Sequence, residues 1–218
     1  MKIIFVPSKS KEKIDTNYFL NISKLFPKNI AIVYSIQYES LAKEAKEILK
    51  KKHNITKFSQ VLGCSKLTFS KETSAVLLIG SGMFHALSLA SSRRFQKSHD
   101  LSLASISNLP IYIYEQGKLS RIQEKEVERF KQHKKAAYVQ FLSSNKVGVL
   151  ISTKSGQQNL SRALNLKRKF KKKKLYFFIG DFLSAQEFEN FRLNSWVNTA
   201  CPRLDMDNAS IINMGDLE

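Results

Sequence analysis

Short apolar runs rich in β-branched residues alternate along the chain with longer stretches in which apolar residues recur at helical spacing. This alternation is typical of βαβ units, in which crossover helices join parallel strands. The runs are apolar throughout, as expected for strands that are covered on both faces. The pattern predicts an α/β fold with strands at residues 2–6, 30–35, 75–79, 111–114, 147–152, 175–179 and 195–198.

The helical stretches indicate how the strands are connected. Apolar residues share one helix face at positions 41–49 and nearly do so at 160–170, so both stretches are expected to be crossover helices. A charge-rich helix at residues 121–141 is expected to lead from one domain to the next. The sequence therefore predicts two domains, residues 1–142 and 143–218. The order of strand, polar turn, helix and cysteine occurs in both halves, which suggests duplication.

Composition limits the class of protein. The 218 residues, 43% of them hydrophobic, are enough for one large or two small cores. No apolar run approaches the roughly 20 residues of a membrane-spanning helix. The N-terminal stretch lacks the long apolar segment and cleavage site of a secretory signal. A cytoplasmic protein without membrane contact is expected.

The formal net charge of +18 favours contact with a polyanion such as RNA. Much of this excess lies in lysine runs, for example at residues 50–52 and 171–174. Both runs lie at the ends of predicted helices, where cations complement the helix dipole. The dipole explanation is favoured, and nucleic-acid binding stays open as the alternative.

A glycine-containing turn follows the predicted strand at residues 75–79. Gly80, Ser81 and Gly82 lead from this strand into a predicted helix. Unpaired N–H groups at a helix start stabilise phosphate or carboxylate groups, and glycines let a ligand approach the backbone. His85, just inside the helix, could touch such a ligand. A purely structural turn explains the same residues, since no complete nucleotide-binding fingerprint is present.

A second polar turn follows the predicted strand at residues 147–152. Ser152, Thr153 and Gln157 belong to a segment that combines hydroxyls, a cation and a glycine between strand and helix. This segment could hold a carboxylate. Alternatively, Thr153 or Ser155 could cap the following helix.

The chain has two cysteines, which are too far apart in sequence for a local zinc site and too few for a disulfide scaffold. Cys64 stands in Val-Leu-Gly-Cys-Ser and Cys201 in Val-Asn-Thr-Ala-Cys-Pro-Arg. A thiolate at a strand end suits an iron-sulfur cluster, whose soft iron atoms bind sulfur. Two buried, inert cysteines are the alternative.

A resemblance to a known family rests on four motifs. They are the two cysteine motifs, Ile-Gly-Ser-Gly-Met-Phe-His at residues 79–85 and Ser-Ile-Gln-Tyr at residues 35–38. In order and spacing they resemble the diphthamide-synthesis 2-(3-amino-3-carboxypropyl)histidine synthase family over nearly the whole chain. Members of that family have three repeated α/β domains around a pseudo-threefold axis. Each domain gives one cysteine to a 4Fe-4S cluster, whose fourth iron is left for S-adenosylmethionine. The resemblance implies the second and third domains, without the first.

The resemblance also implies roles for individual residues. Cys64 would be the cluster ligand of the second domain and Cys201 that of the third, and both would be essential for catalysis. The two polar turns and the Ser-Ile-Gln-Tyr segment would bind S-adenosylmethionine. The residues concerned are Ser35, Gln37, Gly80, Ser81, Gly82, His85, Ser152, Thr153 and Gln157.

The implied activity is the first step of diphthamide biosynthesis. In the family, the reduced cluster cleaves the bond between sulfur and the γ-carbon of S-adenosylmethionine. The resulting 3-amino-3-carboxypropyl radical attacks the imidazole of one histidine of elongation factor 2. The implied protein is a transferase subunit that needs an electron donor and a partner chain supplying the third cysteine. Met83 stands where the family typically has arginine, and the tail after Arg203 is short and divergent.

Two other functions fit the same residues. The chain could be a non-catalytic subunit that scaffolds the complex or presents elongation factor 2. It could also be a basic RNA-binding module, in which case neither cysteine would be needed for binding.

Overall fold

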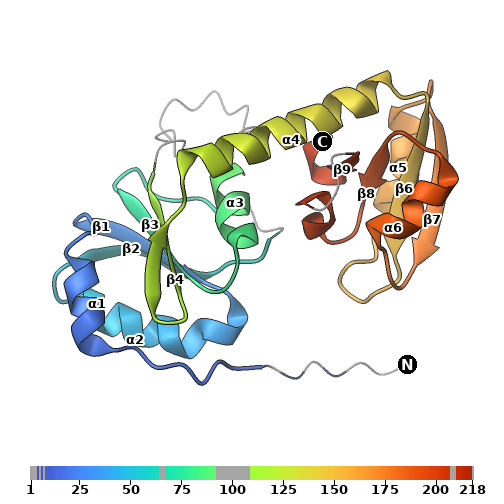
Figure 1. Cartoon of the computed structure of the whole chain (residues 1–218). Coiled ribbons are helices and arrows are strands. Elements are labelled where there is room, and N and C mark those ends of the chain that lie inside the picture. The colour runs from blue at the N-terminus through green and yellow to red at the C-terminus, as the bar shows by residue number, and fades with distance from the viewer. Residues whose placement is uncertain are drawn as a thin grey trace. The chain divides into compact units, whose positions relative to one another are not determined.

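The computed structural model describes residues 4, 6, 8–63, 67–91, 109–206 and 210–217. The chain forms two compact units, residues 1–127 and 128–218, called here the first and second units. Each unit has its own sheet and helices (Figure 1). The α/β class and the duplication of small parallel sheets are therefore confirmed. The strand predicted at residues 2–6 falls mostly outside the described residues.

The first unit is built on a five-stranded sheet in the order β2-β1-β3-β4-β5. All neighbouring strands are parallel except β5, which pairs antiparallel with β4. The elements follow one another as α1 (Thr16–Ser23), β1 (Asn29–Tyr34), a 3-10 turn (Ile36–Tyr38), α2 (Glu39–Leu49), β2 (Asn54–Gln60), β3 (Ala75–Ile79), α3 (Met83–Ser91), β4 (Ile111–Glu115) and β5 (Lys118–Arg121).

Apolar side chains on the two faces of this sheet explain its helix layers. Alternate residues of β1, Ile30, Ile32 and Tyr34, join the core under α1 and α2. Phe19 of α1 packs its ring edge-on against Tyr114, with 5.2 Å between the ring centroids. Helix α3 lies on the opposite side of the sheet from α1 and α2 (Figure 1). The central strands are consequently buried on both faces, as their continuous apolar runs predict.

The second unit has an all-parallel sheet in the order β7-β6-β8-β9. Its elements are α4 (Glu124–Ser143), β6 (Lys146–Ser152), α5 (Leu160–Lys169), β7 (Lys174–Gly180), α6 (Ala185–Phe188), β8 (Trp196–Asn198) and β9 (Ile211–Asn213). Short 3-10 turns follow at Glu189–Phe191, Pro202–Met206 and Met214–Asp216. Helix α4 begins four residues before the second unit, at Glu124, and runs into it.

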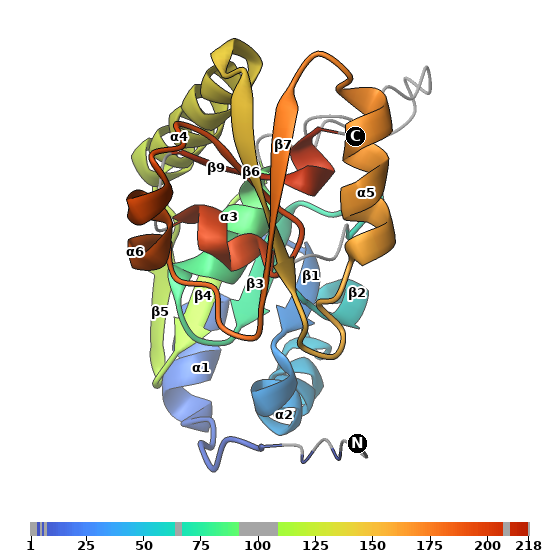
Figure 2. The same cartoon turned by 90° about the vertical axis from the view of Figure 1, so that its right-hand side faces the viewer.

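Two apolar clusters cover the two faces of the second sheet. Ala137 and Phe141 of α4 and residues of α5 pack against one face. Phe188 of α6 and Trp196 pack against the other. Figure 2 shows α5 and α6 on either side of the β6–β7 pair. A Cβ added to Gly148 of β6 would lie 2.0 Å from the Trp196 ring, so the indole fills the space that a side chain would need.

The two sheets share one connectivity. Helix, central strand, crossover helix, edge strand and two further parallel strands occur in the order α1-β1-α2-β2-β3-β4 and again as α4-β6-α5-β7-β8-β9. Strand β3 therefore corresponds to β8, and β2 corresponds to β7. This correspondence decides which loops of the two units match.

Several elements were absent from the sequence prediction. Strand β2 is an edge strand of mostly polar residues, β5 is also mostly polar, and β9 has only three residues, so none forms a continuous apolar run. Helix α1, which begins after the N-cap Asp15, was also missed. The two units divide between residues 127 and 128, near the start of α4, whereas the sequence pattern predicted a boundary at residue 142, near the end of this helix. Ala137 and Phe141 belong to the second core, which ties this helix to the second unit.

Lys173 shows what part of the lysine-rich surface does. Its Nζ donates to the carbonyl oxygens of Phe141, Leu142 and Ser144, at distances of 2.7, 2.9 and 2.7 Å. These carbonyls lie at the C-terminal end of α4, where intrahelical donors run out and a cation complements the dipole. Burial lowers the pKa of the Lys173 ammonium. One lysine of this run, Lys173, thus caps α4, which is not the helix that precedes the run.

Replacing Lys173 by methionine is expected to lower the free energy of unfolding by about 1–2 kcal/mol, because three charged hydrogen bonds to main-chain carbonyls are lost. Urea denaturation followed by circular dichroism measures this change. The exposed neighbour Lys172 provides the control, since Lys172→Met should change the same quantity by less than about 0.5 kcal/mol. Equal effects of the two substitutions would contradict the capping role.

None of the helices in the described part of the chain is both long and apolar enough to cross a membrane.

Candidate functional site

Ser35 and Gly80 meet at the edge of the first sheet where its parallel strands end, called here the carboxyl edge. Ser35 N donates to Ile79 O at 3.2 Å, and Gly80 N donates to Tyr114 O at 3.3 Å. A Cβ added to Gly80 would lie 2.9 Å from Ser35 Oγ. The buried Ser35 side chain therefore occupies the space left by the glycine. Gln37 is exposed on the following turn, where its carbonyl oxygen accepts a hydrogen bond from Ser10 N at 2.8 Å.

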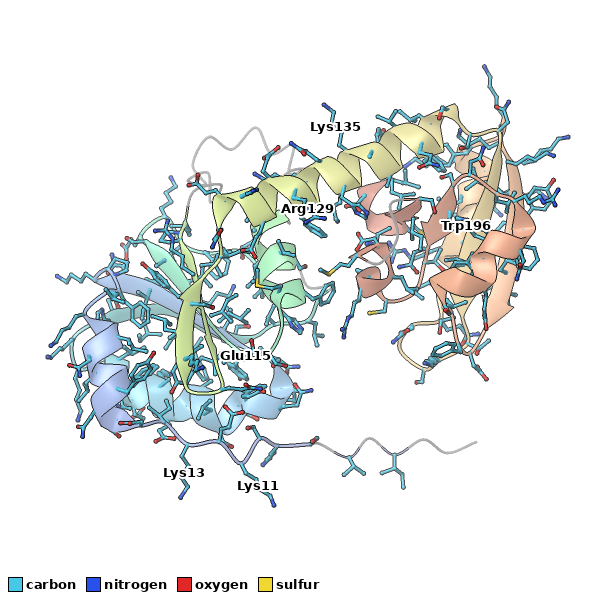
Figure 3. All side chains as sticks on the ribbon, in the orientation of Figure 1. Lys11, Lys13, Glu115, Arg129, Lys135 and Trp196 are labelled. Atoms are coloured by element: carbon cyan, nitrogen blue, oxygen red, sulfur yellow. The ribbon has the colours of Figure 1, made fainter. Side chains whose placement is uncertain are left out.

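The Gly80-Ser81-Gly82 turn already holds a carboxylate of its own chain. Gly82 has φ +78°, a conformation that glycine adopts without strain. Its N–H donates to Glu115 Oε1 at 3.1 Å, from the end of β4 (Figure 3). Ser81 is exposed, and α3 begins at Met83 as the sequence predicts. The turn can therefore bind a carboxylate through backbone N–H, and Glu115 takes that place here.

His85 lies one residue further along α3 than Phe84. The two rings are in edge contact, with 5.4 Å between their centroids, and His85 is half-buried. His85 thus stands on the helix that starts at the carboxyl edge, as expected from its spacing after the glycines.

Cys64 lies outside the described residues, but the segment that leads to it is fixed. Val61 N donates to Tyr34 O at 2.8 Å, which continues the pairing of β1 with β2. The Gly63 carbonyl accepts a hydrogen bond from Ser88 Oγ of α3 at 2.8 Å. A Cβ on Gly63 would lie 1.9 Å from the Phe84 ring, so only glycine fits beneath that ring. Helix α3 therefore holds the segment that ends at Gly63 at the carboxyl edge of the first sheet.

The polar turn of the second unit is ordered by its own backbone. Ser152 is buried, and its Oγ accepts a hydrogen bond from Lys154 N at 3.1 Å. Thr153 N donates to Gly180 O at 3.1 Å, and Gln157 N donates to Lys154 O at 3.0 Å. Thr153 is exposed and Gln157 is half-buried.

The helix-cap interpretation of this turn is wrong. Helix α5 begins at Leu160 with Asn159 as its N-cap residue, so Thr153 and Ser155 lie too early to cap it. The Asn159 side chain makes no capping hydrogen bond either. The turn is longer than the sequence suggested because Gly156, with φ +78°, redirects the chain before the helix starts.

Asn159 instead links the polar turn to the loop that carries Cys201. Its Nδ2 donates to Gln157 O at 3.2 Å and to Thr199 O at 2.7 Å. Thr199 Oγ1 donates in turn to Leu150 O at 2.8 Å. Ser152, Gln157 and the Cys201 loop consequently share the carboxyl edge of the second sheet.

Cys201 is a free, half-buried cysteine that follows β8. Its carbonyl oxygen accepts hydrogen bonds from Asn198 Nδ2 at 2.7 Å and from Leu204 N at 3.2 Å. A thiol at the end of such a fixed loop suits ligation of one iron atom, because soft iron sites take thiolate sulfur. In the described part of the chain no group of three or more His, Cys, Asp or Glu side chains gathers into a metal site. A cluster would need thiolates in addition to this one.

The two cysteines do not occupy matching positions in the repeats. Cys64 comes after β2, whereas Cys201 comes after β8, the counterpart of β3. The segment 199–201 therefore matches the Gly80-Ser81-Gly82 turn of the first unit. The similar order of cysteine and strand in the two halves of the sequence reflects the duplicated sheets, but the cysteines follow strands that do not correspond.

These features define a duplicated α/β protein whose polar turns, and one free cysteine, lie at the carboxyl edges of parallel sheets, where such folds bind their ligands. A model of the diphthamide synthesis protein family matches residues 1–212. The chain belongs to this family.

Individual relatives agree with this assignment. The chain is 26% identical to the 2-(3-amino-3-carboxypropyl)histidine synthase of Pyrococcus horikoshii, over 94% of this chain and 59% of that protein. It is 24% identical to subunit 1 of the Homo sapiens synthase, over 89% of this chain and 45% of that protein. A crystal structure of Dph2 from Pyrococcus horikoshii with a 4Fe-4S cluster has a TM-score of 0.70 and 23% identity, covering 92% of this chain and 60% of that one. The chain spans about half the length of the curated relatives it matches.

The sequence pattern did not predict the residues whose hydrogen bonds hold these turns. These residues are Glu115, Asn159 and Asn198. Glu115 and Asn159 bond backbone groups that are far away in the sequence, and Asn198 belongs to no recognisable motif apart from its place near Cys201. Asn198 stands in the motif around Cys201, and an amide at a strand end three residues before a cysteine is the one signal that could have drawn attention to it.

Proposed function

We propose that this chain is a subunit of a 2-(3-amino-3-carboxypropyl)histidine synthase, in which Cys64 and Cys201 are two of the three thiolate ligands of a 4Fe-4S cluster. One observation carries the proposal. Cys201 is a free, half-buried cysteine on a loop fixed by hydrogen bonds at the carboxyl edge of the second sheet, within the segment matched by the family model. The cluster in the Pyrococcus Dph2 structure supports the same ligand chemistry.

The remaining thiolate has to come from outside these 218 residues, which contain two cysteines. A separate chain, or a further part of a longer protein, that carries the family's remaining domain would supply it. The cluster is then assembled only when this chain and the part that carries the remaining cysteine come together. In this arrangement Cys201 presents its sulfur from the loop after β8, and the second thiolate comes from Cys64, which follows β2 in the chain.

The proposed substrates are S-adenosylmethionine and a histidine of elongation factor 2. When bound and reduced, the cluster would supply the electron that cleaves the sulfur to γ-carbon bond of S-adenosylmethionine. This chain would orient the methionyl part, with the Gly82 N–H, which binds the Glu115 carboxylate in this structure, facing its carboxylate. Further polar contacts would come from Ser35, Ser152, Thr153, Gln157 and His85. Gln37 would approach from the exposed turn after β1. The covered strands behind these turns exclude water from that side.

Anaerobic reconstitution with iron and sulfide tests the proposal. The chain is purified alone and together with the polypeptide that carries the remaining family domain, and iron content and the electron paramagnetic resonance signal are measured. We expect a reducible cluster only in the joint preparation, and its loss in Cys201→Ala and in Cys64→Ala. A preparation in which both cysteine variants keep the cluster would exclude the ligand role and favour a scaffold subunit.

Glu115 should oppose binding of S-adenosylmethionine at the glycine turn. Its carboxylate occupies the Gly82 N–H and places a negative charge where the methionyl carboxylate would lie. Replacing Glu115 by alanine is therefore expected to tighten binding about fivefold, the equivalent of one exposed hydrogen bond. Isothermal titration of the assembled protein measures this affinity, and Glu72→Ala, which also removes an exposed carboxylate from the first unit, is the control. Weaker binding after Glu115→Ala would show that Glu115 holds the substrate ammonium instead.

A further inference from the structure

A buried set of polar side chains holds the loop that carries Cys201. Asn198 and Asn213 are directly paired across β8 and β9, and they are 2% and 7% exposed. Asp205, on the 3-10 turn after the cysteine, is 3% exposed. Buried polar groups cost free energy unless each finds a partner, so a satisfied cluster of this kind specifies one geometry.

Asn198 fixes the backbone on both sides of the cysteine. Its Oδ1 accepts a hydrogen bond from Ala200 N at 2.9 Å, and its Nδ2 donates to Cys201 O at 2.7 Å. The same Nδ2 donates to Asn213 Oδ1, also at 2.7 Å. The amide thus contacts the Thr199–Ala200 peptide group and the Cys201–Pro202 peptide group, which lie on either side of the cysteine. With the backbone held at both points, little rotation remains between them, and this restricts the direction of the Cys201 Cα–Cβ bond.

Asn213 and Asp205 extend the network to the residue after the cysteine. Asn213 Nδ2 donates to Pro202 O at 3.1 Å and to Asp205 Oδ2 at 2.5 Å. Lys134 of α4 lies 3.6 Å from Asp205 Oδ2 and 3.0 Å from Asp216 Oδ2. The buried Asp205 carboxylate is therefore compensated by an ammonium from a helix that contributes no residue to the loop itself.

We propose that Asn198, Asn213 and Asp205, together with Lys134, are positioning residues that set the direction of the Cys201 sulfur for bonding to iron. This proposal rests on the proposed function. A cysteine has one torsion between its backbone and its sulfur, so a fixed backbone leaves the thiolate only a few staggered directions. A ligand held in this way loses little conformational freedom when the metal binds. A loop without the network would have to be ordered by the cluster itself.

Alkylation of Cys201 tests the network without any cluster. In a Cys64→Ala chain, Cys201 is the remaining thiol. The limiting rate with iodoacetamide at high pH, taken from the full pH profile, reports access to the thiolate and not its pKa. We expect that rate to rise about tenfold in Asn198→Asp and about threefold in Lys134→Met, because lost hydrogen bonds and ion pairs shift local opening by that order. Lys134→Arg should restore the slow rate.

Lys135→Met is the matched control for charge, since Lys135 is exposed on the same helix (Figure 3). Urea denaturation of each variant separates local loosening of the loop from loss of the fold. If Asn198→Asp does not fold, the alkylation rate of Lys134→Met alone tests the proposal. A lower urea midpoint with an unchanged alkylation rate in Lys134→Met would overturn the proposal, because the network would then stabilise the fold alone.

Cluster retention gives the second measurement. In the reconstituted joint preparation, Lys134→Met should lose iron to a chelator about fivefold faster than the parent and show a broadened resonance signal, because a sulfur that is less well directed binds less uniformly. Iron loss at the parental rate would contradict the positioning role. If the parent itself binds no cluster, the proposed function fails, and the alkylation rates still decide whether the network orders the loop.

Discussion

Replacing Gly148 by alanine is expected to lower the free energy of unfolding of the second unit by about 3 kcal/mol, since a new methyl group would overpack a filled core. The added Cβ would lie 2.0 Å from the ring of Trp196, which also contacts Phe178 and Phe188. The indole cannot move away without disrupting those aromatic contacts. Thermal and urea denaturation measure the change.

Gly215 provides the control for this substitution. A Cβ on Gly215 meets nothing within 4 Å, so Gly215→Ala should leave stability nearly unchanged. The double variant Gly148→Ala/Trp196→Leu should lose less stability than the sum of the two single losses, because Trp196→Leu makes room for the methyl group. Stability that is unaffected by Gly148→Ala would show that the β6–β8 contact is looser than described.

Replacing Gly63 by alanine is expected to abolish cluster binding while leaving most of the fold intact. The new Cβ would lie 1.9 Å from Phe84, so the segment that leads to Cys64 must move off α3. That movement also breaks the hydrogen bond from Ser88 Oγ to Gly63 O. A displaced thiolate no longer meets the iron, and we expect iron content after anaerobic reconstitution to fall about tenfold or more.

A compensating substitution distinguishes this explanation from general damage. Phe84→Leu removes the ring atoms that the new methyl group would hit, so the double variant Gly63→Ala/Phe84→Leu should regain part of the iron. Circular dichroism should be nearly the same in the parent and both variants. Full iron loading of Gly63→Ala would contradict the view that α3 positions the segment before Cys64.

The strands that sequence predicts best are the ones at the centre of each sheet. β1, β3 and β6 are continuously apolar because helices cover both of their faces. β2 is an edge strand that mixes Thr56, Lys57 and Phe58, so its pattern resembles that of a loop. The alternation of strand and helix was enough to predict the duplicated α/β class, because connectivity depends on the central strands.

The candidate site likewise has one part that the sequence predicts and one part that it does not. The turns after strands are visible in the sequence because the ends of parallel strands meet at one edge. The residues that hold those turns are not visible, since their contacts depend on tertiary pairing. Asn198 meets Asn213 only because β8 and β9 are adjacent, and Gly82 meets Glu115 only because β3 and β4 are adjacent. Roles for such residues follow from strand order, which the sequence pattern does not contain.

Transfer of label from S-adenosylmethionine tests the central claim most directly. The reconstituted joint preparation is reduced under anaerobic conditions with elongation factor 2 and S-adenosylmethionine carrying a carboxyl ¹⁴C label, and radioactivity in elongation factor 2 is counted. The proposed function predicts label on one histidine of elongation factor 2, and none when this chain carries Cys201→Ala or Cys64→Ala. Label that reaches elongation factor 2 at the parental rate with both cysteines replaced would contradict it, because this chain would then provide no ligand for the chemistry.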